Sequence, residues 1–252
     1  MREAPLPAAA AEAPSNDWRS GPIAGFVLAA VGGAIAWAIL EWTPPPFTVP
    51  EEYHVLGIGA PSEKHAALEA VEVQVKRRNA MVALSWLGGL IAGAIAIGEA
   101  FARRSPRAVL LAVPLAAAGG CAAGWIGSLA YEAFGIGPLA SLGDTVKAQA
   151  PMLGLLGAGV GLALGGSHLS LRGGLALSGA GLLAGLLASL VYPVAVSVLL
   201  PTASTDSLIP QGAVNRLVWI GIAAGLLGAT VAGAARPRQS RTPGRQREGT
   251  KS

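Results

Sequence analysis

Six long apolar runs dominate this sequence, and their length limits what the chain can fold into. An α-helix needs about 20 predominantly apolar residues to cross the hydrocarbon core of a bilayer, and no water-soluble core needs that much uninterrupted apolar length. Charged residues make up only 13% of the chain, about half of their share in soluble domains. The sequence therefore predicts an all-α integral membrane protein, built as a bundle of six transmembrane helices. The predicted spans are residues 22–40, 80–102, 108–134, 151–167, 173–200 and 214–235.

Polar segments divide the rest of the chain. Residues 1–20 and 236–252 are poor in large apolar side chains, and we expect both to be disordered in the cytoplasm, on either side of a transmembrane domain over 21–235. The longest loop, 43–79, begins with a stiff, proline-rich stretch. Ser62 can then cap a helix that lies along the membrane interface and runs into the second span. The alternating VEVQV of the same loop also fits a strand.

Basic residues predict the orientation, because cytoplasmic loops collect Lys and Arg. With the N-terminus inside, 12 of the 18 Lys and Arg residues lie on the inner side and 6 on the outer side. The run 76–78 (KRR) opposes this bias, but the loop 103–107 and the basic tail together hold more basic residues. We expect the first span to be an uncleaved signal anchor, because a polar leader precedes it and it is long for a signal peptide. The bias toward Arg, Ala and Gly favours a bacterial inner membrane, with both termini cytoplasmic.

Small residues recur at every fourth position in each of the six spans. The run GAGVGLALGG (157–166) matches neither the dinucleotide pattern G-x-G-x-x-G nor the P-loop, which needs a Lys, so we do not expect it to bind phosphate. Residues four apart share a helix face, and small side chains let helices approach closely in lipid, where hydrophobicity cannot pull them together. Chance spacing in a chain rich in Ala and Gly is the alternative. The predicted helix-packing residues are Gly157, Gly161, Gly165, Gly181, Gly185, Gly221, Gly225, Gly120, Gly124, Gly89 and Gly93.

Two stretches 61 residues apart resemble each other, GWIGSLAY at 124–131 and GLLASLVY at 185–192. Both lie in the outer part of an outward-running span. They suggest a tandem repeat of two helical hairpins, spans two and three followed by spans four and five. Coincidence among Ala, Gly and Leu is the alternative.

Ionisable residues avoid the middle of every predicted span, where a charge would indicate a functional site. His54 and His65 share a loop, but their spacing matches no metal motif, and no Ser or Cys lies in a nucleophile motif. We therefore expect no catalytic residue, no metal and no cofactor. Five charged residues gather at the outer boundary, as interfacial ion pairs or as an outer-rim polar site: Glu41, Glu132, Arg77, Arg78 and Arg216.

Two functions from different classes remain open. The small-residue stripes favour a structural, assembly or partner-binding membrane component without catalytic activity. The hairpin repeat favours, as the alternative, a small transporter or channel for an uncharged or small solute, with its pathway at the repeat interface. Hydroxyls that converge on one cavity would favour transport, and hydroxyls bonded to their own helix would favour the bundle. The hydroxyls to compare are those of Ser85, Ser178, Ser189, Ser197 and Thr230.

The expected partners follow from the same features. They are the lipid bilayer, anionic lipid at the basic tail, and other membrane proteins or a second copy of the chain. Nucleic acid is not expected, because no aromatic residue interleaves the basic residues of the tail.

Overall fold

The chain is described by a computed structural model that covers residues 22–53, 61–102, 106–134, 142–166, 171–203 and 207–235. These ranges contain six helices that are long and apolar enough to cross a membrane, and they contain no strand. The all-α six-helix prediction is therefore confirmed, and the protein is a multi-pass membrane protein. The helices are α1 (Pro22–Trp42), α2 (Ser62–Ala102), α3 (Pro106–Phe134), α4 (Leu142–Gly166), α5 (Leu171–Leu199) and α6 (Ala213–Ala234), with a short 3-10 turn, η2 (Glu51–Tyr53), between α1 and α2.

The six helices form a closed ring in which each helix packs against the next and α6 returns to α1. The most extensive contacts join two antiparallel pairs, α4 with α5 and α2 with α3, and the contacts of α1 with α6 and of α3 with α4 come next. The three helices α2, α4 and α6 also touch one another across the ring. Every second helix therefore faces the centre of the bundle.

Large apolar side chains fill that centre. Most of the largest fully buried side chains lie on α2, α4 and α6, and the helix exteriors expose Leu and Val to the bilayer, as at Leu110, Leu183 and Val198. The bundle is thus apolar both inside and outside, as expected where the solvent is lipid. The buried side chains are Leu84, Leu87, Ile91, Ile95, Met152, Leu153, Leu156, Leu164, Tyr192, Trp219, Ile220 and Leu227.

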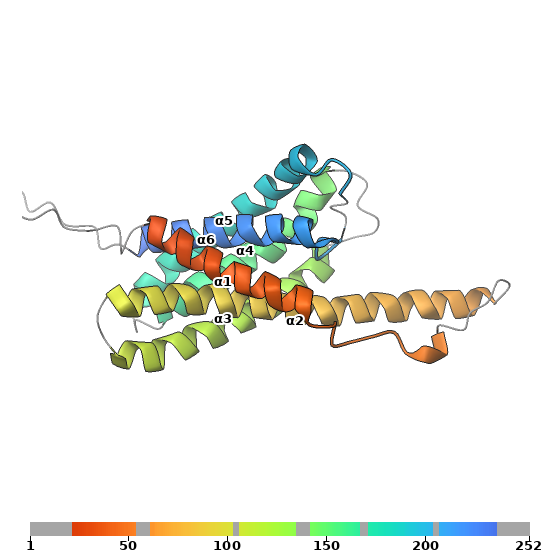
Figure 1. The fold of residues 1–252 in the computed structure, drawn as a ribbon, viewed down its shortest axis with the longest axis horizontal. Helices are drawn as coiled ribbons and strands as arrows, with labels where there is room; N and C mark the ends of the chain where they lie inside the picture. The colour runs from red at the N-terminus through yellow and green to blue at the C-terminus, as the bar shows by residue number, and fades with distance from the viewer. Residues whose placement is uncertain are drawn as a thin grey trace, which may run out of the picture.

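The second helix is much longer than its predicted span. α2 has 41 residues, so it extends over about 60 Å, and its first half projects past the other helices (Figure 1). The helix predicted from Ser62 is confirmed, and the alternative strand does not form. The projection continues along the axis of α2, so the expectation that it lies flat along the membrane interface is wrong.

A strap of residues 43–53 returns from α1 to the side of α2. The Asn79 side chain donates a hydrogen bond to the Phe47 carbonyl (2.9 Å) and accepts one from the Phe47 backbone N–H (3.1 Å). The Arg78 guanidinium lies over the Phe47 ring, 5.6 Å from its centre. These contacts fix the strap at the point where α2 enters the bundle.

The fourth helix begins nine residues before the predicted start of its span at Pro151, and that proline lies inside the helix. Sequence hydropathy counted Asp144, Lys147 and Gln149 as loop. Asp144 and Lys147 instead pair along the helix surface at 3.4 Å, and Gln149 is buried. The bounds of α1, α3, α5 and α6 agree with their predicted spans to within two residues.

Candidate functional site

Glycine residues bring the backbones of α4 and α5 into contact. A Cβ added at Gly157 would overlap the carbonyl of Gly181, and one added at Gly161 would overlap the carbonyl of Leu177. A Cβ added at Gly165 would likewise overlap the backbone of Gly174, and one added at Gly185 would overlap the carbonyl of Leu153. Any side chain at these positions would push the two helices apart.

The α2–α3 pair is built in the same way. Gly120 lies against Gly88, Gly124 lies against the backbone of Leu84, and Gly89 lies against the Cys121 side chain. Gly93 makes a looser contact, because an added Cβ would stand 3.6 Å from the Ala117 Cβ. In the α1–α6 pair, Gly25 and Gly228 occupy the corresponding places. Gly88 and Gly228 were not among the predicted packing residues, although they follow the same spacing.

One predicted packing residue, Gly221, faces no neighbour within the described part of the chain. Gly225 meets the Phe26 ring, whereas no atom of the described residues lies within 4 Å of a Cβ added at Gly221, and that residue is exposed. A spacing of four finds a stripe of small residues on α6 but does not tell which side of the helix meets a neighbour.

The two predicted hairpins share one register. Gly124 packs on Leu84 in the first hairpin, and Gly185 packs on Leu153 in the second. The hydroxyls of Ser128 and Ser189, each four residues further along, donate to the carbonyls of Trp125 and Leu186 at 2.6 and 2.7 Å. The resemblance between 124–131 and 185–192 therefore corresponds to equivalent positions in space.

The α4 contacts place several uncharged polar side chains at one height. We call the end of the bundle at which α1, α3 and α5 finish the loop end, and the opposite end the terminal end (Figure 1). Gly157 lies opposite Gly181 of α5 and would also meet Leu227 of α6. Two helical turns from these contacts, toward the loop end, lie Gln149 on α4, Ser189 on α5 and Trp219 on α6. These three residues therefore lie at the same height in the bundle.

These residues belong to a buried polar layer, which consists of Thr145, Gln149, Ser189, Tyr192, Asn215 and Trp219. All six are buried. The Tyr192 hydroxyl donates to Asn215 Oδ1 at 2.9 Å. Among the residues that the structure describes, neither side-chain amide atom of Gln149 has a hydrogen-bond partner, and neither has the indole nitrogen of Trp219. An unpaired buried amide is costly, so this layer is the part of the interior best suited to hydrogen-bond a neutral molecule.

Sequence reasoning missed this layer. Gln149 lies just outside the predicted fourth span, and Asn215 is the second residue of the sixth. Amide side chains beside the ends of apolar runs were the available signal, because a buried amide needs a partner.

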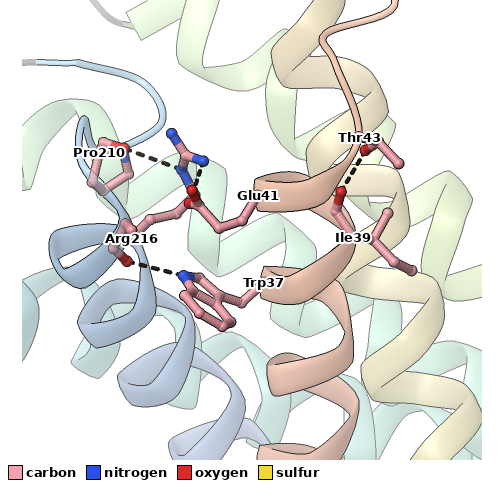
Figure 2. Close-up of polar contacts among 7 residues, drawn as sticks. Trp37, Ile39, Glu41, Thr43, Pro210 and Arg216 are labelled. Carbon is pink, nitrogen blue, oxygen red and sulfur yellow. Dashed lines mark hydrogen bonds and ion pairs between the residues drawn. The ribbon is translucent and has the colours of Figure 1, made fainter.

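A second group of polar residues closes the ring at the loop end (Figure 2). Arg216 Nη1 lies 2.6 Å from Glu41 Oε1, and each side chain is 22% exposed. Arg216 Nε also donates to the Pro210 carbonyl at 3.3 Å, and the Trp37 indole donates to the Ala213 carbonyl at 2.9 Å. The first and last helices are thereby joined by one ion pair and one hydrogen bond, and the bond to Pro210 holds the Arg216 side chain in place.

The predicted outer-rim site is thus brought together only in part. Glu41 and Arg216 form one pair, whereas Arg78 stacks over Phe47 of the strap. Arg77 lies on the neighbouring position of α2. The side chain of Glu132 lies outside the described residues.

The hydroxyls chosen to compare the two functions do not gather in one place. Ser189, Ser197 and Thr230 donate to the carbonyls of Leu186, Val194 and Leu226, at 2.7 to 2.8 Å. Ser85 lies on α2 and Ser178 on α5, toward opposite ends of the bundle. Hydroxyls bonded within their own helix are the pattern expected of a packed bundle.

No group of three or more His, Cys, Asp or Glu residues in the described ranges could hold a metal ion. The His65 ring nitrogen Nδ1 lies 3.3 Å from the Pro61 carbonyl, at the first turn of α2. His54, and the basic tail expected to meet anionic lipid, lie outside the described residues. No family model matches the chain, and the searches of curated proteins and of solved structures found no match either.

Proposed function

We propose that this protein is a structural or partner-binding component of a membrane, without catalytic activity of its own. The observation that carries the proposal is the filled centre of the ring, where Leu87, Ile91, Leu156 and Leu227 are all at most 1% exposed. Tight packing of this kind suits a scaffold. A solute pathway would need a polar or hydrated lining instead.

The projecting part of α2 supports a partner-binding role. Leu68, Val71 and Val75 are half-buried on one side of this helix, whereas Val73 is 60% exposed on another. Most of the stability of a helix in a protein comes from packing of its apolar face, and Val73 is still exposed on this one. A partner protein that packs against the open side would remove Val73 from water and hold the helix in place.

We further propose an orientation and a location. The balance of Lys and Arg favours both termini in the cytoplasm and the projection of α2 outside. In a bacterial inner membrane, the basic tail of residues 236–252 would then face the anionic lipid of the cytoplasmic leaflet.

Photo-crosslinking in native membranes tests the partner. A photoreactive amino acid replaces Val73 on the projection or, as the control, Leu183, which is 62% exposed on the lipid-facing side of α5. We expect a protein adduct of one defined mass from position 73 and only lipid adducts from position 183. Only lipid adducts at both positions, or the same protein adducts at both, would contradict the proposal.

Transport of a neutral solute is the second candidate, and one observation favours it. Gln149 and Trp219 bury polar groups that have no hydrogen-bond partner in the described ranges, and they lie at one level of α4 and α6. Purified protein in liposomes should give no flux of small neutral solutes above empty liposomes if it is a scaffold. Reproducible flux that is abolished by Gln149→Leu would replace the first proposal with the second.

A further inference from the structure

A shallow hollow of about 310 Å³ lies between α2 and α3 near the loop end. The side chains of Trp86 and Trp125 are 47% and 56% exposed, so the hollow opens toward the bilayer. Its volume is at the lower end of that of small-ligand pockets. The lining is almost wholly apolar and consists of Met81, Val82, Ser85, Trp86, Cys121 and Trp125.

The glycine contacts of this pair explain why the hollow forms. Gly124 and Gly88 bring the two backbones together on the inner side of the pair. Gly89 leaves room for Cys121, because an added Cβ would overlap its sulfur. The two Trp side chains on the lipid side are too large to follow this close approach, so space remains between them.

Basic residues lie next to the hollow, toward the projecting end of α2. Residues four apart share a helix face, so Arg77 lies one turn above Met81 and Arg78 lies one turn above Val82, a rise of about 6 Å. The Phe47 ring holds the Arg78 guanidinium from the side of the strap. Lys76, whose side chain is 76% exposed, pairs with Glu72 at 3.6 Å on the next turn out. Positive charge therefore lies about one helical turn beyond an apolar groove, toward the projecting end of α2.

We infer that the hollow and the two arginines form a binding site for one phospholipid with a net negative headgroup. An acyl chain lies between Trp86 and Trp125, and the phosphate lies at Arg77 and Arg78. A zwitterionic lipid fits the same groove but gains less from the arginines, because its headgroup carries a compensating positive charge. The site gives a role to the one basic run that opposes the orientation set by the other Lys and Arg residues.

Native mass spectrometry tests the headgroup preference. The full chain is released from nanodiscs that contain equal amounts of phosphatidylglycerol and phosphatidylcholine, and the retained lipid is identified. We expect retained phosphatidylglycerol in the wild type, and a preference that falls by about fivefold for each arginine removed in R77Q/R78Q. The matched control K64Q/K147Q removes the same charge from exposed positions away from the hollow, and it should keep the wild-type preference.

Tryptophan quenching by lipids with brominated chains tests the groove. Brominated phosphatidylglycerol should quench Trp86 and Trp125 more than brominated phosphatidylcholine does, in variants that retain only these two tryptophans. Val82→Phe, which fills the hollow and leaves both arginines in place, should remove that difference while circular dichroism shows the helices intact.

Three outcomes would overturn the inference. The first is equal retention of the two lipids by the wild type. The second is an equal loss of preference in R77Q/R78Q and in K64Q/K147Q, which would indicate a general surface charge. The third is a dimer in which neither brominated lipid quenches the two tryptophans, which would make a second copy of the chain the occupant.

Discussion

At the scale of single residues, the absence of a side chain at Gly157 is what lets α4 and α5 touch. The carbonyl of Gly181 occupies the place that a Cβ would take. Close backbone approach gains dispersion and weak Cα–H···O contacts, and it does not depend on the hydrophobic effect. Gly221 is also a helical glycine, but no described residue lies within 4 Å of a Cβ added there. Comparing the two positions therefore distinguishes the effect of close packing from the effect of glycine itself.

Gly157→Ala should therefore destabilise the bundle, whereas Gly221→Ala should not. The new methyl group at 157 forces α4 and α5 apart, and overpacking of this kind typically costs about 1–3 kcal/mol. The methyl group at 221 points into lipid, so its effect should stay within about 0.5 kcal/mol. Reversible unfolding in mixed micelles measures the free energy of unfolding of each variant. Equal losses of stability would show that α4 and α5 are not close-packed at Gly157.

At the scale of elements, the α1–α6 contact joins the two ends of the chain. Gly25 and Gly228 meet toward the terminal end, and the Glu41–Arg216 pair lies at the loop end. Because α1 and α6 are the most distant elements in sequence, this contact costs the most loop-closure entropy in the ring. Polar contacts at the loop end help to keep α1 in place.

Removing either partner of this pair should loosen the contact. Glu41→Gln and Arg216→Gln should each destabilise the protein by about 1–2 kcal/mol, because the remaining charge loses its partner in a site that is only partly open to water. The double variant should cost much less than the sum of the two, since both changes remove one interaction. A double-mutant cycle measures this coupling, and strict additivity would contradict the pairing.

Much of the element plan could be predicted from sequence, because six apolar runs are long enough to cross a bilayer. The start of α4 could not, because Thr145 and Gln149 are polar residues that only tertiary contacts bury. The buried polar layer was missed for the same reason. Spacing alone also could not separate Gly225, which meets Phe26, from Gly221, which meets no described residue, because the face that a helix turns to its neighbour is a property of the whole bundle.

At the scale of the whole molecule, a ring of six helices surrounds an apolar centre. Glycine contacts join neighbouring helices, and α2, α4 and α6 supply most of the side chains that fill the middle. The buried polar layer lies toward the loop end. The strap and the projection of α2 (Figure 1) and the Glu41–Arg216 pair are found at the same end. We therefore expect recognition of partners and of lipid at that end, and cohesion along the rest of the bundle.

The most direct test is disulfide formation in native membranes between α2 and α3, which pack against each other through small residues. The Cβ atoms at positions 93 and 117 would lie 3.6 Å apart, within the range that a disulfide requires. With Cys121 changed to Ser, the pair Gly93→Cys and Ala117→Cys should cross-link rapidly under mild oxidation. Gly93→Cys with Gly221→Cys should not cross-link within one chain. If the first pair stays reduced, or if both pairs react equally, the transmembrane helices do not touch along their small faces.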